Sequence, residues 1–326
     1  MQEVSIKGFG AYAPTNTVTN DDLSKIMETS DEWILGRTGI KERRISQGED
    51  TSDIAIKSAK MALERAGISA DAIDLIIVAT LTPDMFTPSV ACLVQKGIGA
   101  GNAMAFDINA ACSGFIYGLQ VAYSMMENNN NFKNVVVIGA EVLSKIIDWE
   151  DRSTCVLFGD GSGAVVLSKT EEEKKKIANF YSKSDGSKGD ALTAGAVDVI
   201  NPYVKEIVTR NKKVEMKGQE VFKFAVTSIV HGIKTVLEDS NLSLEDIDYI
   251  VPHQANLRII EFAAKKLKVD FNKFYVNLDR YGNTSSATIP IALNEMYEKS
   301  LLKKGKKIIM VGFGGGLTFG AALIEL

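Results

Sequence analysis

Short runs of branched apolar residues alternate along the chain with segments whose apolar positions recur at helical spacing. The runs at 74–79 and 134–139 are apolar after their first residue and end at turn signals, as expected of strands buried in a parallel sheet. Residues 52–66 have helical periodicity that stops at Gly67, a residue type that commonly ends helices. Residues 222–237 place apolar side chains along one helical face. This alternation predicts an α/β fold built of layered sheets and helices.

The chain also repeats part of itself. Residues 68–76 resemble 242–250, and Asp74 to Asp248 is an offset of 174. Residues 133–139 resemble 306–312 at almost the same offset. Two matches at nearly one offset predict two duplicated halves, which we place at residues 1–172 and 173–326. The boundary falls in the charged run 169–177, which we interpret as a solvated connection.

The duplication has a geometric consequence for two polar residues. Adding 173 to position 112 gives 285, inside the polar stretch 281–286. Cys112 and Asn283 are therefore expected on equivalent connections of the two halves. If the halves pack about a pseudo-two-fold axis, these side chains face each other across the seam, where ligand sites are often found.

Composition narrows the class of protein. The 326 residues carry 37 Lys and Arg against 41 Asp and Glu, a net charge of −4, which disfavours broad nucleic-acid binding. No apolar run approaches the ~18–20 residues that span a bilayer, and the first residues lack the pattern of a signal peptide. Three cysteines do not form a disulfide framework. We expect a reduced, cytoplasmic protein without nucleic-acid or membrane partners.

The three cysteines differ in their surroundings. Cys92 and Cys155 lie in apolar patterns typical of small buried side chains. Cys112 lies where a strand-like segment turns through small residues into a helical stretch. A cysteine at a helix N-terminus has a lowered pKa, so we expect a usable thiolate, with a packing role as the alternative.

Two further features indicate chemistry near the seam. His253 follows the strand-like run 248–251, at the end of a strand where open α/β sheets place their sites. A cysteine, a histidine and an asparagine without metal-ligand spacing indicate nucleophilic cysteine chemistry. The glycines at 314–316 follow another strand and form either a tight turn or an oxyanion donor.

Six ordered blocks carry a resemblance to a known family, at 29–34, 37–40, 107–115, 253–258, 282–285 and 313–316. The sequence resembles beta-ketoacyl-[acyl-carrier-protein] synthase III, the condensing enzymes that start type II fatty acid synthesis. The resemblance covers essentially the whole chain. It implies a thiolase-like, five-layered αβαβα fold and a homodimer. It also implies an acyltransferase that condenses an acyl-CoA with malonyl-[acyl-carrier-protein] and needs no metal or other cofactor.

The resemblance also implies roles for the seam residues. Cys112 would take the acyl group from coenzyme A, and His253 and Asn283 would bind the malonyl thioester. Loss of CO₂ leaves an enolate oxygen, which two fixed neutral donors stabilise without protonating the carbanion. The backbone N–H groups of Cys112 and Gly315 would hold the acyl-enzyme oxygen.

Binding residues follow from the same resemblance, position by position. Those expected to bind coenzyme A are Thr29, Trp33, Arg37, Arg152, Gly218, Phe222 and Asn256. Those expected to dock the acidic carrier protein are Lys223, Arg258, Lys265 and Lys266, although solvated side chains are the alternative for the lysines. Those expected around the acyl group are Thr87, Leu157 and Phe158. Thr87 aligns with a residue lent across the dimer interface, and a threonine there leaves room for acyl groups longer than acetyl unless Phe86 fills the gap.

Two other interpretations remain at this point. One keeps the fold and the Cys-His-Asn set but assigns them to a condensing enzyme or acyltransferase of secondary metabolism. The other is a non-catalytic acyl-binding relative or a cysteine hydrolase. Intact Arg258 favours a carrier-protein partner, and a non-catalytic relative is disfavoured because Cys112, His253 and Asn283 are all present.

Overall fold

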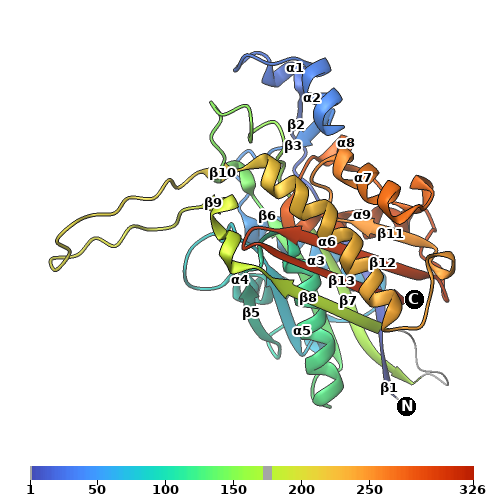
Figure 1. The fold of residues 1–326 in the computed structure, drawn as a ribbon. Coiled ribbons are helices and arrows are strands. Elements are labelled where there is room, and N and C mark those ends of the chain that lie inside the picture. Colours follow the sequence, from blue (N-terminus) through green and yellow to red (C-terminus); the bar gives the residue numbers. More distant parts are fainter. Residues whose placement is uncertain (1, 172–177) are drawn as a thin grey trace.

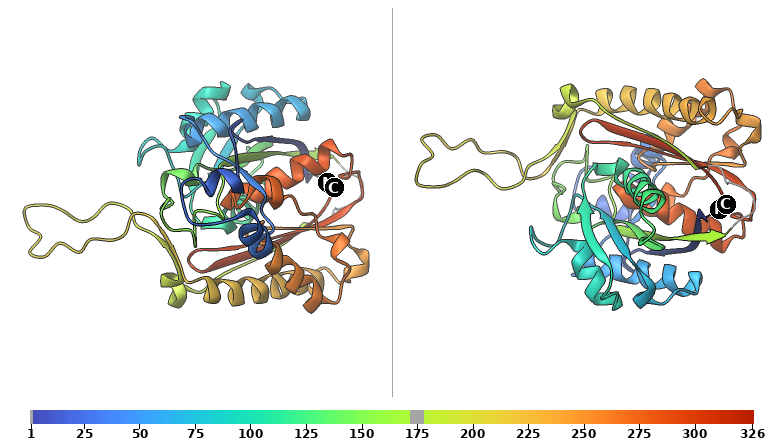
Figure 2. Two further views of the ribbon diagram at one scale, coloured as in Figure 1. Left: turned by 90° about the horizontal axis from the view of Figure 1, so that it is seen from above. Right: turned by 90° about the horizontal axis from the view of Figure 1, so that it is seen from below.

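In the computed structural model, which describes residues 2–171 and 178–326, two β-sheets lie with helices between them and on both outer faces (Figure 1 and Figure 2). The first sheet has the order β1-β7-β6-β4-β5 and comprises β1 (Gln2–Tyr12), β7 (Gly161–Glu171), β6 (Asn134–Glu141), β4 (Leu75–Ala79) and β5 (Met104–Ile108). The second has the order β11-β12-β13-β8 and comprises β11 (Tyr249–Pro252), β12 (Lys307–Gly314), β13 (Thr318–Glu325) and β8 (Ala178–Ser184).

The two sheets follow the same path. In each, a parallel pair (β4–β6 and β11–β12) is followed by an antiparallel neighbour (β7 and β13) and then by an antiparallel edge strand (β1 and β8). Asp74 and Asp248 precede the matching strands β4 and β11, and each carboxylate accepts backbone N–H groups at the start of the neighbouring strand. The duplicated α/β fold expected from the repeat is confirmed.

Three helical layers cover these sheets. The helices are α3 (Thr51–Ala66) and α4 (Val90–Ile98) on the first sheet, α6 (Gly218–Glu238) and α7 (Leu257–Leu267) on the second, and α5 (Gly114–Asn128) and α9 (Thr288–Glu298) between them. The central helices pack with apolar side chains of both sheets in one buried cluster. Helix α3 ends at Gly67, whose φ of 66° is the left-handed conformation that glycine accommodates easily. The five-layered αβαβα architecture is therefore present.

Shorter elements form a lobe beside α7 (Figure 1). They are β2 (Thr17–Thr19), α1 (Asn20–Leu23), α2 (Asp31–Thr38), β3 (Glu42–Arg44) and α8 (Leu278–Tyr281). Arg43, on β3 of this lobe, is buried, and its guanidinium donates to Asn20 Oδ1 at 2.8 Å and to the Val156 carbonyl oxygen at 2.7 Å. The lobe is thereby tied to the segment that carries residues 151–159.

A long extension leaves the body between β9 (Leu192–Ala194) and β10 (Val214–Met216), which pair antiparallel. Residues 195–213, called the arm here, project far from the rest of the chain (Figure 2). The arm exposes large apolar side chains at Val197, Val199, Ile200, Tyr203, Ile207 and Val208. Exposed apolar side chains gathered on one segment are typical of a surface that another molecule covers.

The predicted boundary between the halves falls between β7 and β8. Strand β7 ends at Glu171 and β8 begins at Ala178. Residues 172–177 of the charged run 169–177 lie outside the described residues, so the division at 172/173 stays a prediction.

Candidate active site

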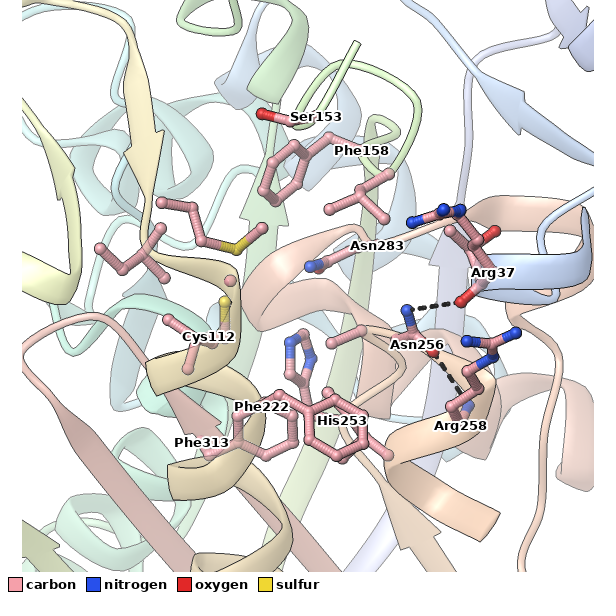
Figure 3. Close-up of a pocket in the computed structure, with 18 of the residues that line it drawn as sticks. Arg37, Cys112, Ser153, Phe158, Phe222, His253, Asn256, Arg258, Asn283 and Phe313 are labelled. Atoms are coloured by element: carbon pink, nitrogen blue, oxygen red, sulfur yellow. Dashed lines mark hydrogen bonds between the residues drawn. The ribbon is translucent and has the colours of Figure 1, made fainter. Parts of the chain in front are cut away.

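Three segments from different parts of the fold bring Cys112, His253 and Asn283 to one cavity of about 620 Å³. Cys112 lies in the 3₁₀ turn η2 (Ala111–Ser113) just before α5. His253 follows the end of β11, and Asn283 follows α8. In Figure 3 the histidine ring and the Asn283 amide nitrogen lie beside the Cys112 sulfur. The structure therefore joins the three residues expected to carry the chemistry.

Two equivalent turns hold these residues. Turn η7 (Ser285–Ala287) precedes α9 as η2 precedes α5, and the two turns contact each other. Ala111 and Ser285 both have positive φ, 46° and 51°. Asn109 Oδ1 accepts the Ala111 N–H at 3.1 Å, and Asn283 Oδ1 accepts the Ser285 N–H at 2.8 Å. Because its oxygen is engaged by the turn, Asn283 presents its NH₂ group to the cavity.

His253 is held as a neutral ring. It is 1% exposed, and this burial lowers its pKa to about 3. The Thr288 hydroxyl is within hydrogen-bonding distance of both His253 Nδ1, at 2.8 Å, and the Ser285 carbonyl oxygen, at 3.0 Å. A neutral imidazole is the state required of a donor that must not act as an acid toward a carbanion.

The prediction that the pKa of Cys112 is lowered, giving a thiolate, is wrong. Burial raises the pKa of Cys112 to about 12, the Ser285 hydrogen bond opposes this shift, and the charge of Glu141 adds to it. The helix N-terminus predicted the opposite direction, because sequence alone does not show how deeply the side chain is buried, at 7% exposed. Cys112 is therefore a thiol until its proton is removed.

The sulfur lies where two cavities meet. A second cavity of about 400 Å³ is also lined by Cys112 and by Phe158, and it includes Gly315. Gly314 approaches so closely that a Cβ there would lie 2.7 Å from the Cys112 nitrogen. The glycine run thus serves a close backbone approach at the nucleophile. Gly315 lines the second cavity, and its role as an oxyanion donor stays a prediction.

Most residues expected to bind coenzyme A gather at the mouth of the first cavity. The Trp33 ring lies 4.8 Å from the Arg37 guanidinium and 5.1 Å from that of Arg152. Arg37 and Trp33 line the cavity together with Gly218, Phe222 and Asn256. Thr29 and Arg152 lie outside the lining, and Arg152 donates to the Glu28 carbonyl oxygen at 2.8 Å. The Thr29 hydroxyl is buried and has no hydrogen-bond partner among the described residues. The described geometry thus forms an aromatic and cationic entrance.

The four basic residues expected to dock the carrier protein separate into two pairs. Arg258 and Lys223 line the cavity mouth, and Arg258 donates to the Gly36 carbonyl oxygen at 2.6 Å. The Asn256 side chain caps α7 and also donates to the Arg37 carbonyl oxygen (Figure 3). Lys265 and Lys266 are exposed on the last turn of α7, outside the lining.

The expected acyl-pocket residues are divided too. Phe158 lines both cavities and Leu157 lines only the first. Thr87 is exposed and lines neither, and the neighbouring Phe86 is 81% exposed. The prediction that Thr87 acts across a dimer interface is not tested within one chain.

Several lining residues escaped sequence reasoning. Leu192 and Met216, at the base of the arm, line the first cavity, and Leu192 also lines the second. No motif marks them, because they reach the site only through the pairing of β9 with β10. Within the described residues we find no cluster of three acidic, histidine or cysteine side chains suited to a metal ion. None of the helices there is long and apolar enough to cross a membrane.

Comparison with known proteins agrees with this geometry. Residues 106–186 match the family 3-Oxoacyl-[acyl-carrier-protein (ACP)] synthase III, and residues 237–326 match its C-terminal family. A Beta-ketoacyl-[acyl-carrier-protein] synthase III from Clostridium beijerinckii is 58% identical over 325 residues, covering 100% of both chains. Its counterpart in Clostridium novyi is 59% identical, covering 100% of this chain and 99% of the relative. The crystal structure of 3-oxoacyl-[acyl-carrier-protein] synthase III from Aquifex aeolicus VF5 has a TM-score of 0.92 at 47% identity, covering 99% of this chain and 100% of that one.

The fold and these similarities define a condensing enzyme of the acyltransferase type with thiolase-like architecture. The chain belongs to the beta-ketoacyl-[acyl-carrier-protein] synthase III family. The family resemblance read from the six sequence blocks is confirmed.

Proposed function

We propose that this chain joins an acyl-CoA primer to malonyl-[acyl-carrier-protein] by decarboxylative Claisen condensation, releasing CoA and CO₂ and forming 3-oxoacyl-[acyl-carrier-protein], the initiating step of type II fatty acid synthesis. The observation that carries this proposal is the meeting of Cys112, His253 and Asn283 at the junction of two cavities. One cavity leads in from the cationic entrance, and the other extends beyond the sulfur.

In the first half-reaction, the Cys112 sulfur attacks the primer's thioester carbonyl. The bond to the coenzyme A sulfur breaks, coenzyme A leaves as a thiol, and the acyl group remains on Cys112. The backbone N–H groups of Cys112 and Gly315 are the proposed donors to the carbonyl oxygen as it becomes negative. The acyl chain extends into the second cavity beside Phe158.

In the second half-reaction, the carrier-bound malonyl thioester enters the emptied first cavity. Loss of CO₂ leaves an enolate, whose oxygen accepts hydrogen bonds from the Asn283 NH₂ and from His253 Nε2. This role places the ring proton on Nε2 and leaves Nδ1 as an acceptor, so the Thr288 hydroxyl must turn its single proton from the Ser285 carbonyl oxygen to Nδ1. The enolate carbon then attacks the acyl group, and the bond to the Cys112 sulfur breaks. Because acyl transfer precedes condensation, the kinetics are ping-pong.

Intact-mass spectrometry tests this sequence of steps. Acetyl-CoA, or a longer acyl-CoA, is expected to add one acyl group to the protein. Malonyl-loaded carrier protein should then discharge the adduct and yield 3-oxoacyl carrier protein. If no acyl-CoA of any length produces an adduct, the covalent mechanism is contradicted. An adduct that survives malonyl carrier protein contradicts the proposed acceptor.

The entrance residues support the proposed substrates. Trp33, Arg37 and Arg152 combine an aromatic face with guanidinium groups suited to the nucleotide and phosphates of coenzyme A. Arg258 and Lys223 add positive charge beside the opening, where an acidic carrier protein would deliver its malonyl group. The reaction is proposed to take place in the cytoplasm.

A homodimer is the proposed assembly. The apolar side chains of the arm, with Met85 and Phe86 on the segment that carries Thr87, are exposed in the single chain. A second copy would remove this apolar surface from water.

Sedimentation velocity should therefore give about twice the 35.4 kDa chain mass. Replacing Val199, Ile200 and Tyr203 together by serine should shift the population toward monomer, and a monomeric parent would contradict the proposal.

A further inference from the structure

A buried carboxylate lies near the nucleophile, and no cation pairs with it in the part of the chain that the structure describes. Glu141 ends β6 and is 0% exposed. Its oxygens accept hydrogen bonds from neutral donors only, within the described residues: Thr80 Oγ1, the Leu81 backbone N–H, Thr82 Oγ1, Ser285 Oγ and Ser286 Oγ. Burial raises the pKa of Glu141 while these donors oppose the rise. Burying a carboxylate without a cationic partner costs free energy of folding, so we expect Glu141 to have a functional role beyond packing.

Ser285 connects this carboxylate to the reacting sulfur. Its hydroxyl donates to Glu141 Oε1 at 3.1 Å. Ser285 also lines the second cavity together with Cys112, on the turn that contacts the Cys112 turn, and its hydroxyl lowers the pKa of that thiol. The Ser285 backbone is fixed because its N–H donates to Asn283 Oδ1, and the residue is 1% exposed. One buried hydroxyl thus stands between the thiol and the carboxylate.

Attack of Cys112 on the thioester requires a group that accepts the thiol proton. His253 does not take it, because burial lowers the pKa of that ring to about 3. Glu141 and a Cys112 thiolate would be two negative charges in one dry site, and each disfavours the other. The pair therefore carries one negative charge in total, on the carboxylate in the resting enzyme and on the sulfur when the proton has moved.

We propose that Glu141 receives the Cys112 proton through the Ser285 hydroxyl during acylation. The S–H proton passes to Ser285 Oγ while the Ser285 proton passes to Glu141 Oε1. The sulfur then forms its bond to the acyl carbon, and the bond from that carbon to the coenzyme A sulfur breaks. The proton held on Glu141 returns through Ser285 to the departing coenzyme A sulfur, so no external base is consumed. This inference rests on the proposed function.

The titratable groups around the carboxylate are few. Among the described segments that contact it, Cys112 on η2 is the titratable side chain, because 80–82 and η7 contribute only hydroxyl and backbone groups. Asp160 precedes β7, the strand next to β6, and its carboxylate is hydrogen-bonded to Ser46 and Ser144. His253 lies on the other side of Ser285 and stays neutral.

A matched pair of serine substitutions isolates the relay. Ser285→Ala removes the connecting hydroxyl, and Ala111 shows that alanine fits the same positive φ at the equivalent turn. Ser286→Ala removes another donor to the same carboxylate oxygen, at 3.0 Å, but leaves the hydroxyl beside Cys112 in place. We expect Ser285→Ala to slow single-turnover acylation by about 10²-fold, a scale typical of a lost proton-transfer partner. The acylation rate of the Ser286→Ala variant should remain within about threefold of the parent's rate.

The Glu141→Gln variant tests whether Glu141 accelerates or slows acylation of Cys112. A glutamine cannot accept the proton, so acylation should slow by about 10²-fold. The parent's acylation rate should rise with pH as Glu141 ionises, with an apparent pKa above the usual carboxyl range. In the glutamine variant the acylation rate should no longer show this rise. If Glu141 acted only through its charge, its removal would lower the pKa of Cys112 and acylation would become faster. That outcome would overturn the relay.

A second measurement separates this inference from a purely structural role and from the proposed function. Decarboxylation of malonyl carrier protein uses His253 and Asn283, so the three variants should retain it within about threefold. Equal losses of acylation and decarboxylation, with a lowered melting temperature, would show that Glu141 and Ser285 only hold the turn and would contradict the relay. Failure of the parent to form any acyl-enzyme would instead contradict the proposed function itself.

Discussion

Replacing Cys112 by serine is expected to abolish acyl-enzyme formation from acyl-CoA. The hydroxyl is a weaker acid than the thiol and a weaker nucleophile toward a thioester in this buried site. Acylation should fall by about 10⁴-fold or more, the scale seen when nucleophiles are removed from other acyl-transfer enzymes. Intact-mass spectrometry after incubation with acetyl-CoA provides the measurement.

The chain offers matched controls for this substitution. Cys92→Ser changes a partly buried thiol outside both cavities, and Cys155→Ser changes one that is 1% exposed and contacts Met27. Both variants should acquire the acyl group like the parent. An adduct on Cys112→Ser, or a loss of the adduct in Cys92→Ser alone, would show that the nucleophile has been misassigned.

The thiol's state predicts a pH dependence for the parent as well. Because burial raises the pKa of Cys112 to about 12, alkylation by iodoacetamide needs a thiolate that is scarce near neutrality. The alkylation rate should therefore rise about tenfold per pH unit between pH 7 and pH 10, as the thiolate fraction does. A rate that is already flat at pH 7 would show instead that the helix N-terminus outweighs burial.

The parts of the fold that sequence predicts are those decided by local patterns. The apolar runs became β4 and β6 because both faces of those strands are buried, and continuous apolar runs have that meaning. Gly67 ended α3 where expected because the left-handed conformation is favoured locally. The repeat carried more: it placed Cys112 and Asn283 on equivalent turns, since duplicated halves retain the path of the chain.

The remaining features of the site depend on long-range packing. Glu141 gave one signal, a charged residue at the end of an apolar strand, but its donors Ser285 and Ser286 are 144 and 145 residues away. The direction of the Cys112 pKa shift was wrong for the same reason, because desolvation comes from segments distant in sequence. The arm has no periodicity that predicts its projection, so Leu192 and Met216 could not be assigned to the site.

Removing the Asn283 side chain is expected to separate the two half-reactions. Asn283→Ala should slow malonyl decarboxylation by about 10²–10³-fold, as for other lost oxyanion donors. Acyl-enzyme formation on Cys112 should fall far less, only through the lost hydrogen bond that holds Ser285. Single-turnover acylation and the release of CO₂ from malonyl carrier protein measure the two steps separately. If acylation is lost first, the division of labour between Cys112 and Asn283 is wrong.

A conservative variant distinguishes donation from support of the turn. Asn283 Oδ1 accepts the Ser285 N–H at 2.8 Å, and aspartate would retain that acceptor while losing the NH₂ donor. Asn283→Asp should therefore fail in decarboxylation at least as severely as alanine, since it also places a negative charge beside the developing enolate. Rescue by aspartate would mean that the residue only shapes the turn.

Because burial lowers the pKa of His253 to about 3, its ring remains a neutral donor across pH 5–9. The decarboxylation defects of both Asn283 variants should therefore not depend on titration of that ring.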